Sequence, residues 1–163
     1  MEAIDLSTAG IRIGIAYEAT SGSRPTSNYT NIPGPKSIPA MDDAPSLLDS
    51  TSLNATRYKT YIQGLRDING GDIAITFNYT QAFCDTWDAM YATNEANKAT
   101  GKRAWLVFYI PGIEDSFFMP VDIVPRGNPG ADVDSVLETT GHFTPIGEPG
   151  FYTAINPTDP AST

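Results

Sequence analysis

Few residues in this chain are of the types that carry out catalysis or bind metals. The chain has one histidine, His142, and one cysteine, Cys84. A serine nucleophile would need His142 as its base, but no nucleophile-elbow sequence is present to hold such a serine. One cysteine and one histidine also fall short of the ligand set of an ordinary zinc site. We therefore interpret His142 as a solvated strand residue and Cys84 as a buried or half-buried thiol.

Carboxylates are the remaining candidates for chemistry. The spacing of Asp132 and Asp134 would allow them to bind a cation or to act as the two carboxylates of a glycosidase. Such a pair is a weak signal in a chain with 19 acidic residues, and the sequence contains no glycine-rich phosphate loop. We expect no catalytic residues, no metal site and no cofactor, with a glycosidase-like enzyme kept as an alternative.

The charge of the chain argues against wrapping of nucleic acid. The net charge is −9, and residues 104–163 hold eight acidic residues against one basic residue, Arg126. Proteins that wrap nucleic acid need clustered Lys and Arg, which this balance does not provide. The composition is instead compatible with a surface that repels nucleic acid.

Length and composition predict one folded domain with many turns. A chain of 163 residues can bury a single hydrophobic core, and 14 Gly and 13 Pro argue against a mostly helical protein. No apolar stretch is long enough to span a membrane, and the first ten residues lack a basic segment followed by a hydrophobic one. We expect a soluble protein that is made in the cytoplasm.

Alternation of apolar and polar residues predicts most of the strands. The clearest strand is 72–80, which follows an Asn-Gly-Gly turn signal. One of its faces would carry Ile73, Ile75, Phe77 and Tyr79. Further strands are expected at 11–17, 104–110, 116–124 and 132–143. The segment 104–110 is apolar on both faces and should be buried on both, whereas 11–17 has one apolar face. Pro120 implies a sheet edge or a bulge in its strand.

One helix is predicted, from Gln81 to Lys98. Its apolar stripe at helical spacing consists of Phe83, Trp87, Met90 and Tyr91. Gly101 is a suitable stop signal. Six to eight strands and one helix predict a mainly β protein, an antiparallel β-sandwich or partly closed barrel with one α-helix packed on it. We expect this domain to span 1–149, followed by a Pro-rich C-terminal tail at 150–163.

The segment 39–68 has little regular pattern, although 47–53 could form a strand. Long loops in compact domains are usually functional or disordered. A disordered linker would have few apolar groups, whereas this loop carries Tyr58, Tyr61, Ile62 and Leu65. These side chains either pack back on their own domain or anchor the loop on a neighbouring subunit.

Several motifs in the chain occur in the order of one known family. They are Lys59-Thr60-Tyr61-Ile62-x-Gly64-Leu65-x-Asp67 before a glycine turn and an alternating strand, Gly34 to Pro39, Leu48-Asp49-x-Thr51-x-Leu53, and Thr144 to Pro149. This ordered set, which runs from about Gly10 to Pro149, resembles the major tail tube proteins of long, non-contractile-tailed bacteriophages of the lambda type.

The resemblance implies a structural virion protein with the tail-tube fold. Its copies would form hexameric rings that stack into a tube, the conduit through which viral DNA leaves the particle without specific binding. The expected partners are other copies, a tape measure protein inside the tube, and tail terminator and tail-tip proteins at its ends. The protein would be assembled in the bacterial host cytoplasm and reside in the virion tail.

The resemblance also assigns roles to residues. The long assembly loop would contact another subunit through Tyr58, Lys59, Tyr61, Ile62, Leu65, Arg66 and Asp67. Strand parity puts Asp132, Asp134 and Glu138 on one face. We expect this face to line the lumen, together with Asp122 on the neighbouring strand, because rings of carboxylates would keep DNA off the wall.

Two non-enzymatic alternatives remain. A type VI secretion tube protein has the same general architecture, and a small carbohydrate-binding β-sandwich has a similar strand content. The second would be a monomer with an exposed aromatic platform, for which the predicted exposed strand faces offer few aromatic residues.

Overall fold

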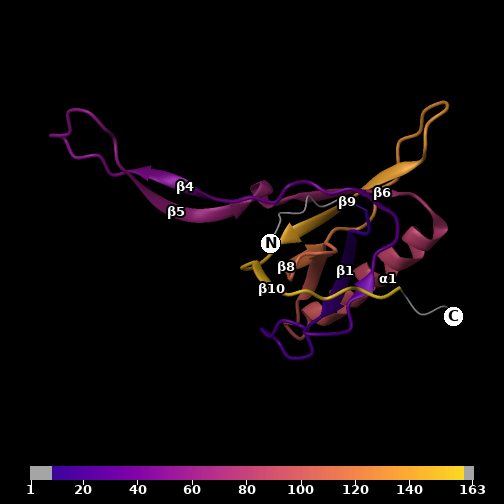
Figure 1. The fold of residues 1–163 in the computed structure, drawn as a ribbon. Helices are drawn as coiled ribbons and strands as arrows, with labels where there is room; N and C mark the ends of the chain where they lie inside the picture. The colour runs from indigo at the N-terminus through magenta and orange to yellow at the C-terminus, as the bar shows by residue number, and fades with distance from the viewer. Residues whose placement is uncertain (1–8, 160–163) are drawn as a thin grey trace.

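The computed structural model describes residues 9–159 of the chain (Figure 1). Its strands are β1 (Arg12–Tyr17), β2 (Thr30–Asn31), β3 (Pro35–Ser37), β4 (Asp43–Asp49), β5 (Tyr61–Ile68), β6 (Ile73–Asn78), β7 (Ala104–Tyr109), β8 (Asp115–Ile123), β9 (Glu138–Pro145) and β10 (Gly150–Thr153). The helix α1 spans Gln81–Lys98, and a short 3-10 turn spans Asn69–Gly71.

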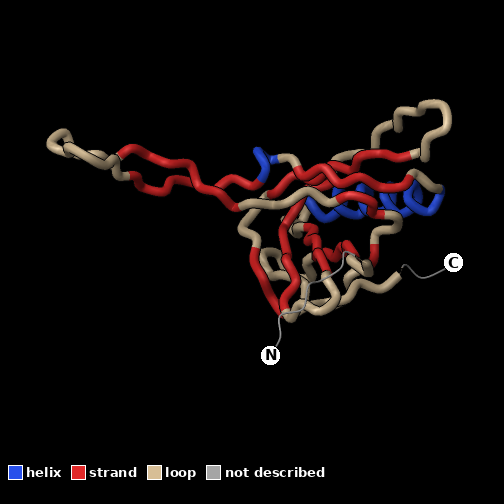
Figure 2. Tube along the Cα trace, turned by 45° about the horizontal axis from the view of Figure 1, so that its top comes forward, coloured by secondary structure: helices blue, strands red, loops and turns tan. Residues whose placement is uncertain are grey.

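Eight of these strands form one antiparallel sheet. The order is β2-β1-β7-β8-β9-β6-β3, and β10 pairs with β8. The sheet curls into a half-barrel with α1 lying along one side of it (Figures 1 and 2). The remaining strands, β4 and β5, form a separate two-stranded ribbon. The predicted fold class, a mainly β partly closed barrel with one helix packed on it, is confirmed.

The helix has the predicted bounds and the predicted buried stripe. The Thr80 side chain accepts a hydrogen bond from the Phe83 backbone N–H and so satisfies one free donor of the first turn. Gly101 adopts a φ of +72° just beyond the C-terminus, a conformation that glycine reaches without strain. Buried α1 residues face β6, whose alternation is also confirmed: Ile73, Ile75 and Phe77 are fully buried.

Trp87 is the centre of the core between α1 and the sheet. Its ring centroid lies 5.8 Å from that of Phe77, 5.4 Å from Phe83 and 5.0 Å from Phe143. Its indole N–H donates to the Val124 carbonyl oxygen at 3.0 Å, so its polar atom is satisfied although the side chain is fully buried. The tryptophan therefore joins α1 to β6, β9 and the end of β8.

Trp87 fits because β9 has a glycine beneath it. A Cβ atom at Gly141 would lie 2.6 Å from the Trp87 Cη2 atom and 2.8 Å from the Phe77 ring. Both neighbours are buried aromatic rings that have little freedom to move.

We predict that Gly141→Ala destabilises the protein by about 1–3 kcal/mol through overpacking. Thermal unfolding followed by circular dichroism measures the change. Gly127→Ala is the matched control, since a Cβ there would meet no atom within 4 Å. Equal melting temperatures for the two variants would show that the core yields at this point.

The opposite face of the sheet is also covered, which corrects the one-sided pattern expected for 11–17. Ala16 packs there with Trp105, Val107 and Phe118, and the partly buried Ile155 joins them. The alternation of apolar and polar residues did not predict this burial, because the second face of β1 carries small residues. Segments distant in sequence pack closely against these small residues. By contrast, β7 is buried on both faces as predicted.

The segment after Pro149 packs on this second face, although we expected a Pro-rich tail from residue 150. β10 pairs with β8, and Thr158 forms a parallel bridge with Thr30. The Arg24 guanidinium lies 4.0 Å from the Tyr152 ring centroid and 4.7 Å from that of Phe118. Residues 160–163 of the expected tail lie outside the described residues.

Pro120 lies inside the sheet rather than at a free edge or bulge. One part of β8 pairs with β10, from Asp115 to Phe118, and another part pairs with β9, from Val121 to Ile123. Pro120 falls between the two parts, where the partner strand changes. The residue without an N–H thus lies at a gap in the ladder on that side of β8.

A buried carboxylate joins the end of β1 to β7. Glu18 accepts hydrogen bonds from the backbone N–H of Arg103 at 2.8 Å and from the Trp105 indole N–H at 3.0 Å. It also pairs with the Arg103 guanidinium at 3.2 Å. Burial alone would raise the pKa of Glu18, but these hydrogen bonds outweigh it and hold the pKa below its ordinary value.

We predict that Glu18 stabilises the fold at neutral pH and loses this effect in acid. A carboxyl group with a lowered pKa in the folded state stabilises it above the unfolded-state pKa of about 4.3, and the effect disappears as the pH falls through the folded value. Glu18→Gln should therefore lower the melting temperature at pH 7, and the difference from the natural protein should shrink toward pH 3. A difference that stays constant with pH would contradict this role.

Candidate assembly interface

The segment 39–68 contains a β-hairpin, not the mostly irregular loop expected from the sequence. β4 and β5 pair antiparallel from Asp43 opposite Ile68 to Asp49 opposite Tyr61. This hairpin with its connecting loop, residues 43–68, is called the arm below, and the loop 50–60 is its tip. The arm projects from one end of the body into solvent (Figures 1 and 2).

The junction of the arm with the body is well defined. Ile68, the last residue of β5, is buried in the core. The next residues, Asn69, Gly70 and Gly71, all have positive φ and turn the chain back into β6. The Asn69 side-chain amide donates to the Ala40 carbonyl oxygen at 3.0 Å, which ties this turn to the segment that enters the arm.

The arm exposes a large amount of apolar surface. Its exposed apolar residues are Leu47, Leu48, Leu53, Tyr58, Tyr61, Ile62 and Leu65. Soluble monomers rarely expose contiguous apolar patches of this kind unless they bind something there. The four anchors predicted from the sequence, Tyr58, Tyr61, Ile62 and Leu65, are 54–89% exposed, so in this structure they do not pack back on their own domain.

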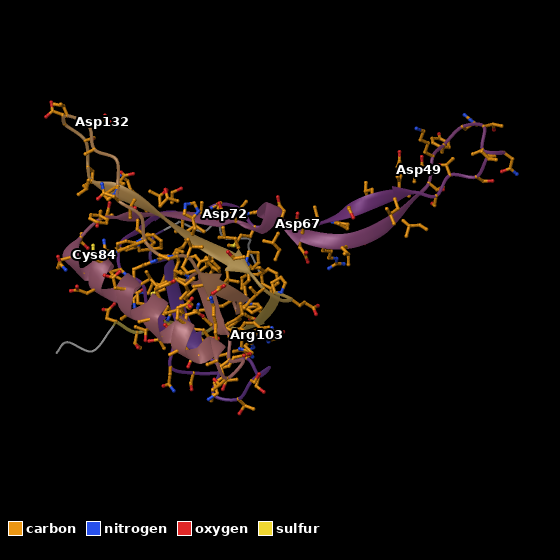
Figure 3. All side chains as sticks on the ribbon, turned by 180° about the vertical axis from the view of Figure 1, so that it is seen from behind. Asp49, Asp67, Asp72, Cys84, Arg103 and Asp132 are labelled. Carbon is orange, nitrogen blue, oxygen red and sulfur yellow. The ribbon has the colours of Figure 1, made fainter. Side chains whose placement is uncertain are left out.

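The polar residues of the predicted set lie at the two ends of the arm. Arg66 pairs with Asp43 at 3.3 Å across the base of the hairpin. Asp67 lies opposite Ala44 at the same end, and Figure 3 shows it where the arm leaves the body. Lys59 belongs to the tip and is exposed.

Sequence reasoning missed three exposed residues of the arm. Leu47 and Leu48 belong to β4, and Leu53 lies in the tip, where its side chain is fully exposed. The two adjacent leucines break the period-2 pattern of a half-buried strand, so they gave no signal for a face. The signal that could have identified them is the presence of several apolar residues in a segment whose spacing fits neither a buried strand face nor a helix stripe.

The predicted acidic strand face does not exist as a unit. β9 begins at Glu138, and Asp132 and Asp134 lie in the loop 124–137 that precedes it. Asp134 has a φ of +56°, which a strand does not allow and which Asp adopts in turns. Glu138 forms an ion pair with Lys36 on β3, across the intervening strand β6. The parity argument was wrong because the apparent alternation continued through a turn.

Asp122 lies apart from the other acids and under the helix. Its carboxylate accepts a hydrogen bond from the Asn94 side-chain amide at 2.7 Å and pairs with Lys98 at 3.0 Å. Burial alone would raise the pKa of Asp122, but these partners outweigh it and hold the pKa below its ordinary value. Asp122 thus helps to fix the C-terminal part of α1 to β8.

The remaining candidates for chemistry have structural environments. Cys84 is a buried thiol on α1, as predicted. The His142 Nδ1 atom lies 2.9 Å from Asp72, in an exposed pair beside the arm junction. Within residues 9–159, no group of His, Cys, Asp and Glu is arranged to hold a metal ion. No helix in the same range is long and apolar enough to cross a membrane.

No protein-family model and no curated protein matches the sequence, but solved structures match the fold. A chain of the anti-feeding prophage baseplate, in a 6-fold symmetrised structure, has a TM-score of 0.59 and 9% identity over 94% of this chain and 97% of its own. A chain of the tail of an empty gene transfer agent particle has a TM-score of 0.59 and 12% identity, over 91% of this chain and 100% of its own. A chain of the SPP1 tail tube has a TM-score of 0.55 and 13% identity, over 93% of this chain and 81% of its own.

The chain has a tail-tube fold. The matches cover 91–94% of the sequence, so the likeness extends beyond a small shared core. At these identities the likeness concerns the backbone arrangement. The interface residues of the tail-tube fold must therefore be worked out from this chain's own exposed groups.

We predict that the tip is the first site of proteolysis in the free protein. Arg57 and Lys59 lie in the exposed tip, outside the paired part of the hairpin. Trypsin should cut there first, and the two fragments should remain together in size-exclusion chromatography because the body strands hold them. Mass spectrometry of the earliest fragments identifies the site. A double variant, Arg57→Gln with Lys59→Gln, should lose this first cut. Early cleavage at Arg126 instead would contradict the expectation.

Proposed function

We propose that this protein is a structural component of a tail tube that assembles from copies of itself. The observation that carries the proposal is the combination of the tail-tube fold with an arm whose apolar side chains are exposed in the described part of the chain. A self-assembling protein needs such unsatisfied surface, and a secreted or catalytic monomer would be expected to hide it. Edge strands such as β10 and β3 offer further backbone groups for contact between copies.

Six-fold rings that stack are the form of assembly we propose. Two of the matching structures are described as 6-fold symmetrised or as having C6 symmetry. Contacts between different surfaces of identical copies close into a ring by rotation, and rings with unlike top and bottom faces stack without limit. An arm that projects from one end of the body suits contact with another copy (Figures 1 and 2).

Passage of viral DNA through this tube is part of the proposal. A chain with a net charge of −9 would present a wall that repels the phosphate backbone rather than holding it. The lumen location of Asp122, Asp132, Asp134 and Glu138 stays a prediction. A tape measure protein in the lumen, terminator and tip proteins at the ends, assembly in the host cytoplasm and the lambda-like subdivision of the family likewise remain predictions from the sequence resemblance.

A second candidate is a ring of a baseplate or of a secretion-type tube. The anti-feeding prophage match, which comes from a baseplate and covers 94% of this chain, favours it. The two functions differ in how far the purified protein assembles. A tube protein stacks into long tubes, whereas a baseplate ring stops at one or a few rings unless other components are present.

We predict that the purified protein forms rings and tubes as its concentration rises, and that loss of the arm prevents this. The deletion variant lacks residues 44–67 and joins Asp43 to Ile68, which face each other across the hairpin, through two glycines. It should stay folded as a monomer because the body core lies outside the deleted segment. Light scattering and negative-stain electron microscopy measure assembly.

A second variant keeps both strands of the arm and replaces only the tip, residues 50–60, by Asn-Gly, a sequence that favours a two-residue hairpin turn. Comparison with the deletion separates the contribution of the tip from that of the strands. If the natural protein remains a monomer at every concentration, the tube function is wrong. If the arm deletion still builds normal tubes, the arm is not an assembly element although the fold assignment stands.

A further inference from the structure

An apolar groove lies beside the base of the arm. Its volume is about 700 Å³, and it is walled by the segment 38–43, the turn between β7 and β8, and the start of β10. Most of its surface is carbon, from residues such as Met41, Ile113, Phe117 and Phe151. Ile113 is 43% exposed and Phe151 is 70% exposed, so the groove is open to solvent.

The tip of the same chain does not fill this groove. Figure 3 shows Asp67 at the base of the arm and Asp49 far out along it, so the hairpin leads the tip away from the body. The strands are paired along this length, which holds the hairpin extended. The groove is therefore left accessible to a segment of another molecule.

The charges around the groove select the kind of occupant. Asp42 and Asp115 belong to its wall, and within residues 9–159 neither has an ion-pair partner. Asp43 also lies there but is neutralised by Arg66. The groove thus combines an apolar floor with two uncompensated negative charges. It suits a segment that carries apolar side chains next to basic ones.

The tip has this composition. Leu53 and Tyr58 are 106% and 79% exposed. Arg57 and Lys59 flank Tyr58, and neither makes an ion pair within the described part of the chain. The tip, residues 50–60, contains no acidic residue. It is the complement of the groove in both apolar character and charge.

Another exposed apolar segment of the body, the loop 124–137, fits poorly. The loop 124–137 projects from the end of the body opposite to the arm (Figures 1 and 2) and exposes Val133 and Val136. However, Asp132 and Asp134 flank Val133 and would approach the acidic wall of the groove with like charge.

We propose that the groove binds the arm tip of a second copy of this chain. Leu53 and Tyr58 of the second copy lie against the apolar wall, and its Arg57 and Lys59 face Asp42 and Asp115. The inference rests on the proposed self-assembly and names the surface that receives the arm. Because each copy carries one tip and one groove in different places, the contact is heterologous and each copy can bind the next.

Cysteine cross-linking tests the contact directly. The variant with Leu53→Cys and Ile113→Cys should form a ladder of disulfide-linked chains under mild oxidation, seen on non-reducing gels, because a disulfide requires Cα atoms within about 7 Å. The single variants are controls, and the natural Cys84 is buried. The matched competitor is Val133→Cys with Ile113→Cys, which should form no ladder. A ladder from the competitor alone would overturn the proposal in favour of the loop.

Charge reversal provides a second, independent test. Asp42→Lys with Asp115→Lys should raise the protein concentration needed for assembly about tenfold, and so should Arg57→Glu with Lys59→Glu. All four changes in one chain restore the original net charge and should restore assembly.

Failure of this rescue together with absence of the Leu53–Ile113 cross-link, in a protein that still forms tubes, would overturn the groove assignment but not the tube function. A natural protein that forms no assemblies would refute the tube function itself. A small apolar molecule retained in the groove, detected by native mass spectrometry, would also overturn the assignment.

Discussion

The seating of Trp87 over Gly141 is the contact on which the rest of the structure depends. The indole fills the space between α1 and the curled sheet, where Phe77 and Phe143 meet it from neighbouring strands. Its hydrogen bond to Val124 also fixes the end of β8, from which the loop 124–137 departs. A single buried ring thus fixes the position of α1 on the curved sheet. It also fixes the end of the body from which the loop 124–137 departs.

The tight packing of the body core supports an arm whose apolar side chains remain exposed. A two-stranded hairpin alone is marginally stable in water, and this one places its larger side chains in solvent. It is held in position because Ile68 is buried in the body and Asn69 is bonded to Ala40. The arm thus exposes apolar side chains that a monomer would normally bury, while the body holds the base of the arm in place. This arrangement is expected of a segment that becomes buried against another copy.

Local patterns predicted the parts of the fold that depend on local physics. The helix 81–98 and the strand at 73–78 follow from periodicity, and the buried β7 from its continuous apolar run. Predictions failed where distant segments decide. Gly14 and Ala16 gave no hint that Pro157 and Ile155 would cover their face of β1. The sequence predicted a long loop with apolar anchors and left open whether these anchors pack on their own domain. It did not predict the pairing of the arm, because the strands of an isolated ribbon have no buried face to impose alternation.

Contacts within the described chain divide its carboxylates into those that have an ion-pair partner and those that have none. Asp122 is bound by Asn94 and Lys98, so its sequence position on a strand said little about its availability. Asp42 and Asp115 have no ion-pair partner in residues 9–159 and lie together only because the segment before the arm meets the turn before β8. Copies with a net charge of −9 repel one another at a distance. A contact that pairs the acidic groove with a tip free of acids relieves that repulsion locally, and it limits association to the one orientation in which tip and groove meet.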